Sequence, residues 1–153
     1  MRYAVSYTDI AGRPLARDPG IGLTLYRVNG PLVVLTRVRG LYPNDTWAGR
    51  TVTYRRVRCT GGQISVRLGT DAQLFDRNQV VTATVQGKQV GSISIPPSEQ
   101  VVLGVPLIPD SAQRCEVTFT AKTLRVPARI QPGSTDHRPL GAHYYTFDFT
   151  GPR

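Results

Sequence analysis

Alternation of apolar and polar residues with a period of two is the feature that most constrains how this chain can fold. In the stretch 63–68 every second residue is apolar, and the stretch 101–107 repeats the pattern. The runs 115–121 and 143–149 alternate in the same way. Each run has one face to bury and one to expose, which is typical of strands in antiparallel sheets packed face to face.

Further strands are expected at 22–28, 32–39, 50–59, 79–86 and 88–95. Gln86-Gly87-Lys88 reads as a tight hairpin turn, in which Gly supplies the positive φ. At Arg55 and Arg56 the alternation slips, and a β-bulge there would return both flanking apolar pairs to the core.

About eight to ten short strands, separated by frequent Gly and Pro, predict an all-β fold, an antiparallel two-sheet sandwich of jelly-roll type. The sandwich is expected over residues 23–153. Residues 1–22 are expected to form an arm or linker that can supply one edge strand.

The two cysteines, Cys59 and Cys115, both have the parity of the buried face. A disulfide between them would join the two sheets or two neighbouring strands, and it would imply an oxidising compartment. The alternative is two buried free thiols in a cytosolic protein. Without Cys-x-x-Cys spacing or a supporting His pair, the cysteines do not predict a zinc site.

Motifs of catalysis are missing from the sequence. It contains no Gly-x-Ser-x-Gly, no His-Glu-x-x-His, no phosphate-binding glycine loop and no dinucleotide-binding turn. Glutamate occurs only as Glu99 and Glu116, and the spacing of His137 and His143 fits no common metal motif. We therefore expect a protein that is not an enzyme and that needs no cofactor.

A first candidate site lies in the turn 40–50, which holds Tyr42, Asp45, Trp47 and Arg50. Sugars pack their C–H faces on Trp or Tyr rings, while carboxylate and guanidinium groups bind the hydroxyls. These four residues therefore form a candidate glycan-binding site. The alternative is that Trp47, the only tryptophan, belongs to the core.

A second segment, 135–149, precedes and includes the last strand. Asp136 can accept from the backbone two residues on, as an Asx turn does, and Arg138 can pair with it. Gly141 permits a close backbone approach. We interpret these residues as a structural turn that fixes the start of the last strand.

The formal charge is +9, and seventeen of the nineteen basic residues are Arg. Such an excess favours anionic partners, although a solvated basic surface would show the same composition. Aromatic residues are sparse among the basic residues of the stretch 37–67, so a basic nucleic-acid-binding domain is the less favoured alternative function and nucleic acid is a less favoured partner. The basic residues considered are Arg37, Arg39, Arg50, Arg55, Arg56, Arg58 and Arg67.

Three short motifs carry a resemblance to a known family. The run Asp136-x-Arg138-x-Leu140-Gly141 with the aromatics after it resembles the closing strand of carboxyl-terminal domains of actinobacterial cell-wall membrane glycosyltransferases. The turn from Leu41 to Trp47 and the step 59–62 are similar too. The resemblance extends over about residues 23–150.

This resemblance implies a jelly-roll domain outside the membrane that binds or orients a cell-envelope glycan or another anionic polymer. It would be a non-catalytic accessory module, tethered to the membrane through a parent glycosyltransferase. No apolar stretch follows the charge at the amino terminus, so we expect an exported domain to be part of a larger protein. Some such jelly rolls hold a structural calcium, for which Asp148 is the one candidate ligand. The open alternative is a sandwich domain for structure or protein interaction, without a ligand.

Overall fold

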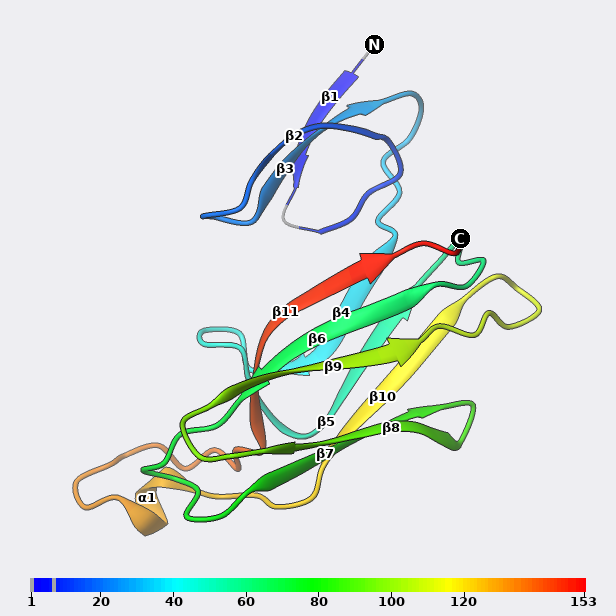
Figure 1. The fold of residues 1–153 in the computed structure, drawn as a ribbon. Coiled ribbons are helices and arrows are strands. Elements are labelled where there is room, and N and C mark those ends of the chain that lie inside the picture. The colour runs from blue at the N-terminus through cyan, green and yellow to red at the C-terminus, as the bar shows by residue number, and fades with distance from the viewer. Residues whose placement is uncertain (1, 7) are drawn as a thin grey trace.

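The computed structural model describes residues 2–6 and 8–153 of the chain (Figure 1). Within them it has eleven strands and one four-residue helix, α1, Pro127–Ile130. The strands are Arg2–Ser6 (β1), Arg13–Asp18 (β2), Leu23–Val28 (β3), Thr36–Leu41 (β4), Trp47–Arg56 (β5), Gln63–Gly69 (β6), Gln79–Val85 (β7), Lys88–Ile95 (β8), Gln100–Pro106 (β9), Cys115–Ala121 (β10) and Ala142–Thr150 (β11).

Strands β4 to β11 form one curled, antiparallel sheet that folds over itself into a sandwich. One layer contains β11, β6 and β9, and the other contains β4, β5, β10, β7 and β8. The layers are joined through β5, which pairs with β11 at its beginning and with β10 along its second half. On the far side β8 lies alongside β9. The predicted all-β, antiparallel sandwich is therefore confirmed.

The core lies between these layers and consists of the side chains with the predicted inward parity. Ile64, Val66 and Leu68 of β6 are fully buried. They meet Val117 and Phe119 of β10, which are fully buried as well. The two-residue period of the sequence therefore identified the buried face of the central strands correctly.

The turn between β7 and β8 also matches its prediction. Gln86 and Gly87 both have positive φ, 50° and 77°, and Val85 pairs with Lys88 across them. Two consecutive residues with positive φ give the backbone twist that a two-residue hairpin needs.

The bulge predicted at Arg55 and Arg56 is wrong. The pairing of β5 with β10 runs without a register shift from Thr51 to Arg56, and the strand ends there rather than at residue 59. Arg56 keeps the inward parity and is only 9% exposed. A long side chain with an apolar stem can occupy such a position if its charged end finds partners.

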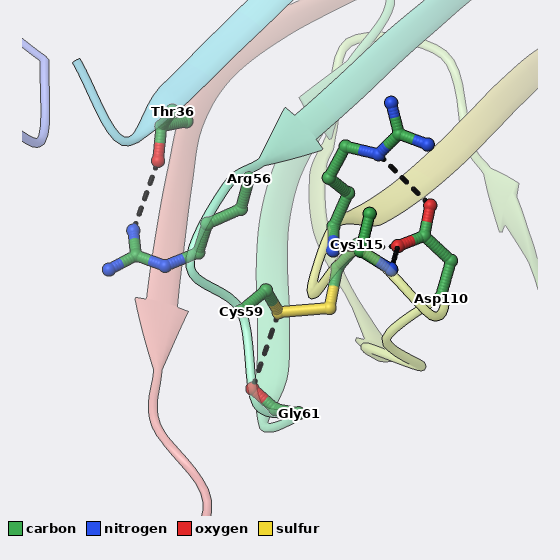
Figure 2. The surroundings of a disulfide bond; sticks show 8 residues. Thr36, Arg56, Cys59, Gly61, Asp110 and Cys115 are labelled. Carbon is green, nitrogen blue, oxygen red and sulfur yellow. Dashed lines mark hydrogen bonds and ion pairs between the residues drawn. A yellow bond between two sulfur atoms is a disulfide. The ribbon is translucent and has the colours of Figure 1, made fainter. Parts of the chain in front are cut away.

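Cys59 and Cys115 form the predicted disulfide (Figure 2). Cys115 is the first residue of β10, and Cys59 lies in the segment that follows β5. Because β5 and β10 are hydrogen-bonded neighbours, the bond joins adjacent strands rather than the two layers. Disulfides persist in oxidising surroundings, so the bond indicates an extracytoplasmic compartment.

The first three strands make a separate small sheet, in the order β1-β3-β2 (Figure 1). The predicted boundary at residue 22 falls just before β3, whose hydrogen-bonded neighbours are β1 and β2.

Arg56 connects this sheet to the sandwich. Its Nη1 donates to Asp9 Oδ2 at 2.7 Å and to Thr36 Oγ1 at 3.0 Å, and its guanidinium lies 3.7 Å from the centroid of the Phe149 ring (Figure 2 shows Thr36 and Arg56).

No helix in the described part of the chain is long and apolar enough to cross a membrane.

Candidate functional site

The Arg138 side chain holds two loops together at one end of the sandwich. Its guanidinium donates to both carboxylate oxygens of Asp45, in the β4–β5 turn, at 3.2 and 2.8 Å. It also donates to both oxygens of Asp136, in the loop before β11, at 2.7 to 3.2 Å. The backbone N–H of Arg138 donates to Asp136 Oδ1 at 2.9 Å, which is the geometry of an Asx turn. Two segments 93 residues apart in sequence are thus joined by one cation.

These contacts keep both carboxylates ionised. Hydrogen bonds from Arg138 hold the pKa of Asp136 at about 2 and lower the pKa of Asp45. Donors that favour the charged form of a carboxylate act in this direction. General acid catalysis needs a carboxyl group that carries a proton near neutral pH, so the pair is suited to binding and structure rather than to glycoside hydrolysis.

Tyr42 takes part in the same connection. Its hydroxyl donates to the Pro139 carbonyl at 3.1 Å, and its ring faces the Arg138 guanidinium at 4.9 Å. One face and the polar end of Tyr42 are therefore already used within the protein.

Gly141 and Gln79 fix the beginning of the last strand. A Cβ at Gly141 would lie 2.5 Å from the Gly49 carbonyl oxygen and 2.7 Å from Ala121 Cβ, so only glycine fits. Gln79 is 1% exposed. Its Nε2 donates to the carbonyls of Thr123 and Gly141, and its Oε1 accepts from the N–H groups of Val80 and Thr123. Sequence reasoning missed Gln79, since a polar residue at the beginning of a strand carries no sign of burial.

An aromatic row crosses the outer side of β5 and β11 beside these loops. Trp47 and His143 are directly paired in register, and their rings are stacked with centroids 5.3 Å apart and planes 9° apart. The Tyr145 ring follows, with its centroid 4.0 Å from that of His143. Tyr145 is 40% exposed, whereas Trp47 and His143 are half-buried. The row is thus open to solvent mainly at Tyr145.

A bulge in β11 ends this row. The register with β6 shifts between Tyr144 and Thr146, so Tyr145 stays on the outer side next to His143 while Phe147 packs into the core. The Tyr145 ring covers Gly69 of β6, where a Cβ would lie 2.7 Å from Tyr145 Cε2. The alternation predicted through 143–149 is interrupted at this point, which the sequence did not reveal.

The edge of the row next to the β4–β5 turn is polar. Thr46 Oγ1 and His143 Nε2 are hydrogen-bonded at 2.7 Å, and burial lowers the pKa of His143. The imidazole is therefore neutral at physiological pH. Asp45 Oδ1 accepts from the backbone N–H of Trp47 at 3.2 Å, so the turn directs Asp45 toward Arg138 and leaves its carboxylate 37% exposed.

Arg50 does not join this group. Its Nη1 donates to the carbonyls of Ala121 and Lys122 at 3.0 and 3.2 Å, at the end of β10. The structure therefore brings together Tyr42, Asp45 and Trp47 of the four predicted residues, and places Arg50 against a neighbouring strand end. Trp47 also packs on the buried cluster of Leu74, Phe75 and Leu140, so it contributes to the core as well.

Asp148, the predicted calcium ligand, lies on the exposed side of β11. Its carboxylate is 3.9 Å from the Arg17 guanidinium. Within residues 2–6 and 8–153 no three His, Cys, Asp or Glu side chains are grouped so that they could hold a metal ion. Asp148 is therefore not part of a three-ligand set.

No protein-family model matches this chain, and no curated protein sequence does. Among solved structures, the chain is similar to one described as the EclA C-terminal domain, a sugar-binding protein. The identity is 11%, the match covers 82% of each chain, and the TM-score is 0.44. A likeness at this level assigns no ligand to the chain.

Proposed function

We propose that this protein is a non-catalytic, extracytoplasmic module that binds a glycan on the row formed by Trp47, His143 and Tyr145. The observation that carries the proposal is the exposure of Tyr145 beside two stacked rings on the outer face of the sandwich. Binding sites for small molecules combine aromatic surface with a few well-placed polar groups. Here the polar groups are Thr46 and Asp45, next to the row.

The proposal is supported by the way in which contacts within the protein already hold the rings of the row in place. His143 is hydrogen-bonded to Thr46, Trp47 packs on His143 and on the cluster around Leu140, and the Tyr145 ring packs over Gly69 and beside His143. A rigid surface loses little conformational entropy when a ligand binds, which matters for the weak contacts of a sugar ring. The residues we assign to the site differ from those expected from sequence: Tyr145 and His143 are added, while Tyr42 and Arg50 act within the protein.

A titration with neutral oligosaccharides followed by NMR tests this proposal. The chain has one tryptophan, so its single indole N–H signal reports on the row directly. A ligand should shift that signal. Tyr145→Ala should weaken binding by about tenfold, the factor that corresponds to about 1.4 kcal/mol. The matched control is Tyr3→Ala, an exposed tyrosine of the small sheet, which should leave the affinity unchanged.

Tyr145→Ala is a better test than Trp47→Ala, because Trp47 also packs on buried residues and its loss is expected to lower stability. Unchanged affinity in Tyr145→Ala would contradict the site. A complete lack of shifts across the panel would contradict glycan binding and favour a domain for structure or docking.

We further propose that the module serves a membrane glycosyltransferase of the cell envelope. This part of the proposal is supported by the resemblance of the turn 136–141 and of the two shorter motifs, together with the extracytoplasmic disulfide. The test is to read the coding sequence upstream of Met1 for membrane helices. A gene with no membrane helices encoded in the same reading frame would contradict it.

A further inference from the structure

The outer face of β4, β5 and β10 contains a basic groove of about 360 Å³, at the other end of β5 from the aromatic row. Three arginines line it, and Glu116 is its one acidic residue. Among the residues that the structure describes, the lining consists of Val34, Arg37, Arg39, Thr53, Arg55, Val57 and Glu116.

Strand register places these arginines close together. Arg37 on β4 is directly opposite Arg55 on β5, and Arg39, two residues on, points to the same side. Arg55 is in turn opposite Glu116 on β10 and donates to it at 2.7 Å. Like charges in directly opposed positions destabilise a sheet, so the Arg37–Arg55 pair costs stability unless an anion lies between them.

Glu116 neutralises only part of this charge. It pairs with Arg55, whereas the side chains of Arg37 and Arg39 are exposed and make no hydrogen bond or ion pair with any other residue in the described part of the chain. Two guanidinium groups with all their donors unused therefore face one groove. Planar guanidinium groups match the geometry of carboxylates and phosphates.

A second hollow continues from the first and shares Arg55 and Glu116 with it. Its further lining is balanced in charge, because Arg114 is paired with Asp110, and apart from Gly87 and the apolar Ile108 the rest is polar: Thr84, Gln86 and Thr118. A ligand that fits both hollows has an oxyanion at the Arg37–Arg39 end and uncharged hydroxyl groups along the rest.

We infer that this groove binds an anionic glycan, through carboxylate, phosphate or sulfate groups placed between Arg37, Arg39 and Arg55. Nucleic acid fits less well, since among residues 2–6 and 8–153 no aromatic side chain lines either hollow for a base to stack on. The disulfide also indicates an oxidising compartment rather than the cytosol or the nucleus. The inference does not depend on the aromatic row, which is a separate surface.

The test compares two double variants with the same change in net charge. Arg37→Gln/Arg39→Gln removes the free charges of the groove. Arg77→Gln/Arg129→Gln removes two exposed arginines that lie outside both hollows. Binding to oligogalacturonate, poly(glycerol phosphate) and chondroitin sulfate is measured by titration calorimetry over a range of salt concentrations, with oligothymidylate as the nucleic-acid probe.

The groove variant should bind the preferred polyanion at least about tenfold more weakly in low salt. The slope of the logarithm of its binding constant against the logarithm of the salt concentration should fall in magnitude by about 2, one for each lost contact. The control should stay within about twofold of the unmodified protein.

The three anionic polymers show which oxyanion is preferred. Equal losses in both variants would show diffuse attraction and overturn the site, and tighter binding of oligothymidylate than of all three glycans would overturn the ligand class. Tyr145→Ala should leave polyanion binding unchanged, so that failure of the aromatic row and failure of the groove are distinguishable.

Discussion

Gln79 Nε2 donates a hydrogen bond of 2.7 Å to the carbonyl oxygen of Gly141, linking residues 62 positions apart. The same amide makes three further hydrogen bonds with Thr123 and Val80, so all of its polar atoms have partners inside the protein. The backbone of the loop that leads to β11 thus depends on one buried side chain.

Gln79→Leu should therefore destabilise the protein far more than the same substitution at an exposed strand position. Leucine has a similar size, but the carbonyl groups of Thr123 and Gly141 and the N–H groups of Val80 and Thr123 lose their partner. We expect a loss of about 2 to 4 kcal/mol in the free energy of unfolding. Urea denaturation measures it, with Gln89→Leu as the exposed control on β8. Equal midpoints for the two variants would contradict the role of Gln79.

Gly141→Ala should also destabilise, for steric reasons. The added Cβ would meet the Gly49 carbonyl oxygen and Ala121 Cβ, neither of which is the mobile end of a side chain. Overpacking of this kind costs about 1 to 3 kcal/mol. Gly151→Ala is the matched control, because the nearest atoms to its Cβ are 4.0 Å away. Thermal unfolding of both variants should show a lower Tm for Gly141→Ala alone.

Reduction of the disulfide should lower stability without changing the fold. The bond closes a loop with a sequence separation of 56 residues. Loop-closure entropy predicts a contribution of about 4 kcal/mol. Urea curves with and without dithiothreitol measure the difference, and alkylation followed by mass spectrometry should detect no free thiol before reduction. A free thiol in the unreduced protein would contradict the pairing.

Stability should fall in acid as the Asp136–Arg138 contact is lost. The pKa of Asp136 in the folded protein is about 2, against an ordinary value of 3.8. A carboxylate with a lowered folded pKa adds stability that is complete above its unfolded pKa and is lost as the pH falls from 3.8 toward 2. Asp136→Asn should flatten this part of the curve of stability against pH. An unchanged curve in that interval would show that the contact adds nothing.

The small N-terminal sheet should become more accessible to protease when its connection to the sandwich is removed. Asp9 accepts hydrogen bonds from both Arg56 and Tyr26, which lie in different sheets. Arg56→Met keeps a long apolar stem near Phe149 but removes the donor to Asp9. We expect faster cleavage between residues 29 and 35, measured by limited proteolysis and mass spectrometry. Arg67→Met, an exposed arginine on β6, is the control and should be cleaved at the original rate.

Much of the sandwich could be predicted because its strands follow local rules. The stretches 63–69 and 115–121 alternate without interruption, and the turn at Gly87 needs only two residues with positive φ. The parity of Cys115 likewise follows from its own strand. None of these predictions requires knowledge of which strands are neighbours.

The remaining features depend on which strands are hydrogen-bonded neighbours, and this pairing cannot be predicted from the sequence alone. Trp47 meets His143 only because β5 pairs with β11 across 95 intervening residues. Phe147 packs against the core, instead of following Tyr145 to the outer side, only because a bulge interrupts the alternation opposite Leu68 and Arg67. A bulge was expected to displace Arg56. Instead Asp9, before β2, and Thr36 of β4 accept hydrogen bonds from its guanidinium, and that group packs on the Phe149 ring of β11.

The position of β4 has a consequence for how copies of this protein behave toward each other. β5 is the only described strand that pairs with β4, so the other edge of β4 is open to a strand from another molecule. Open edges promote aggregation, and charged side chains and irregular pairing oppose it. Arg37 and Arg39 supply the charge, and Gly40, whose φ is 98°, lies where the register with β5 shifts. By this rule the arginines of the groove oppose edge-to-edge pairing, and we expect a polyanion that neutralises them to remove that barrier to self-association at the same time.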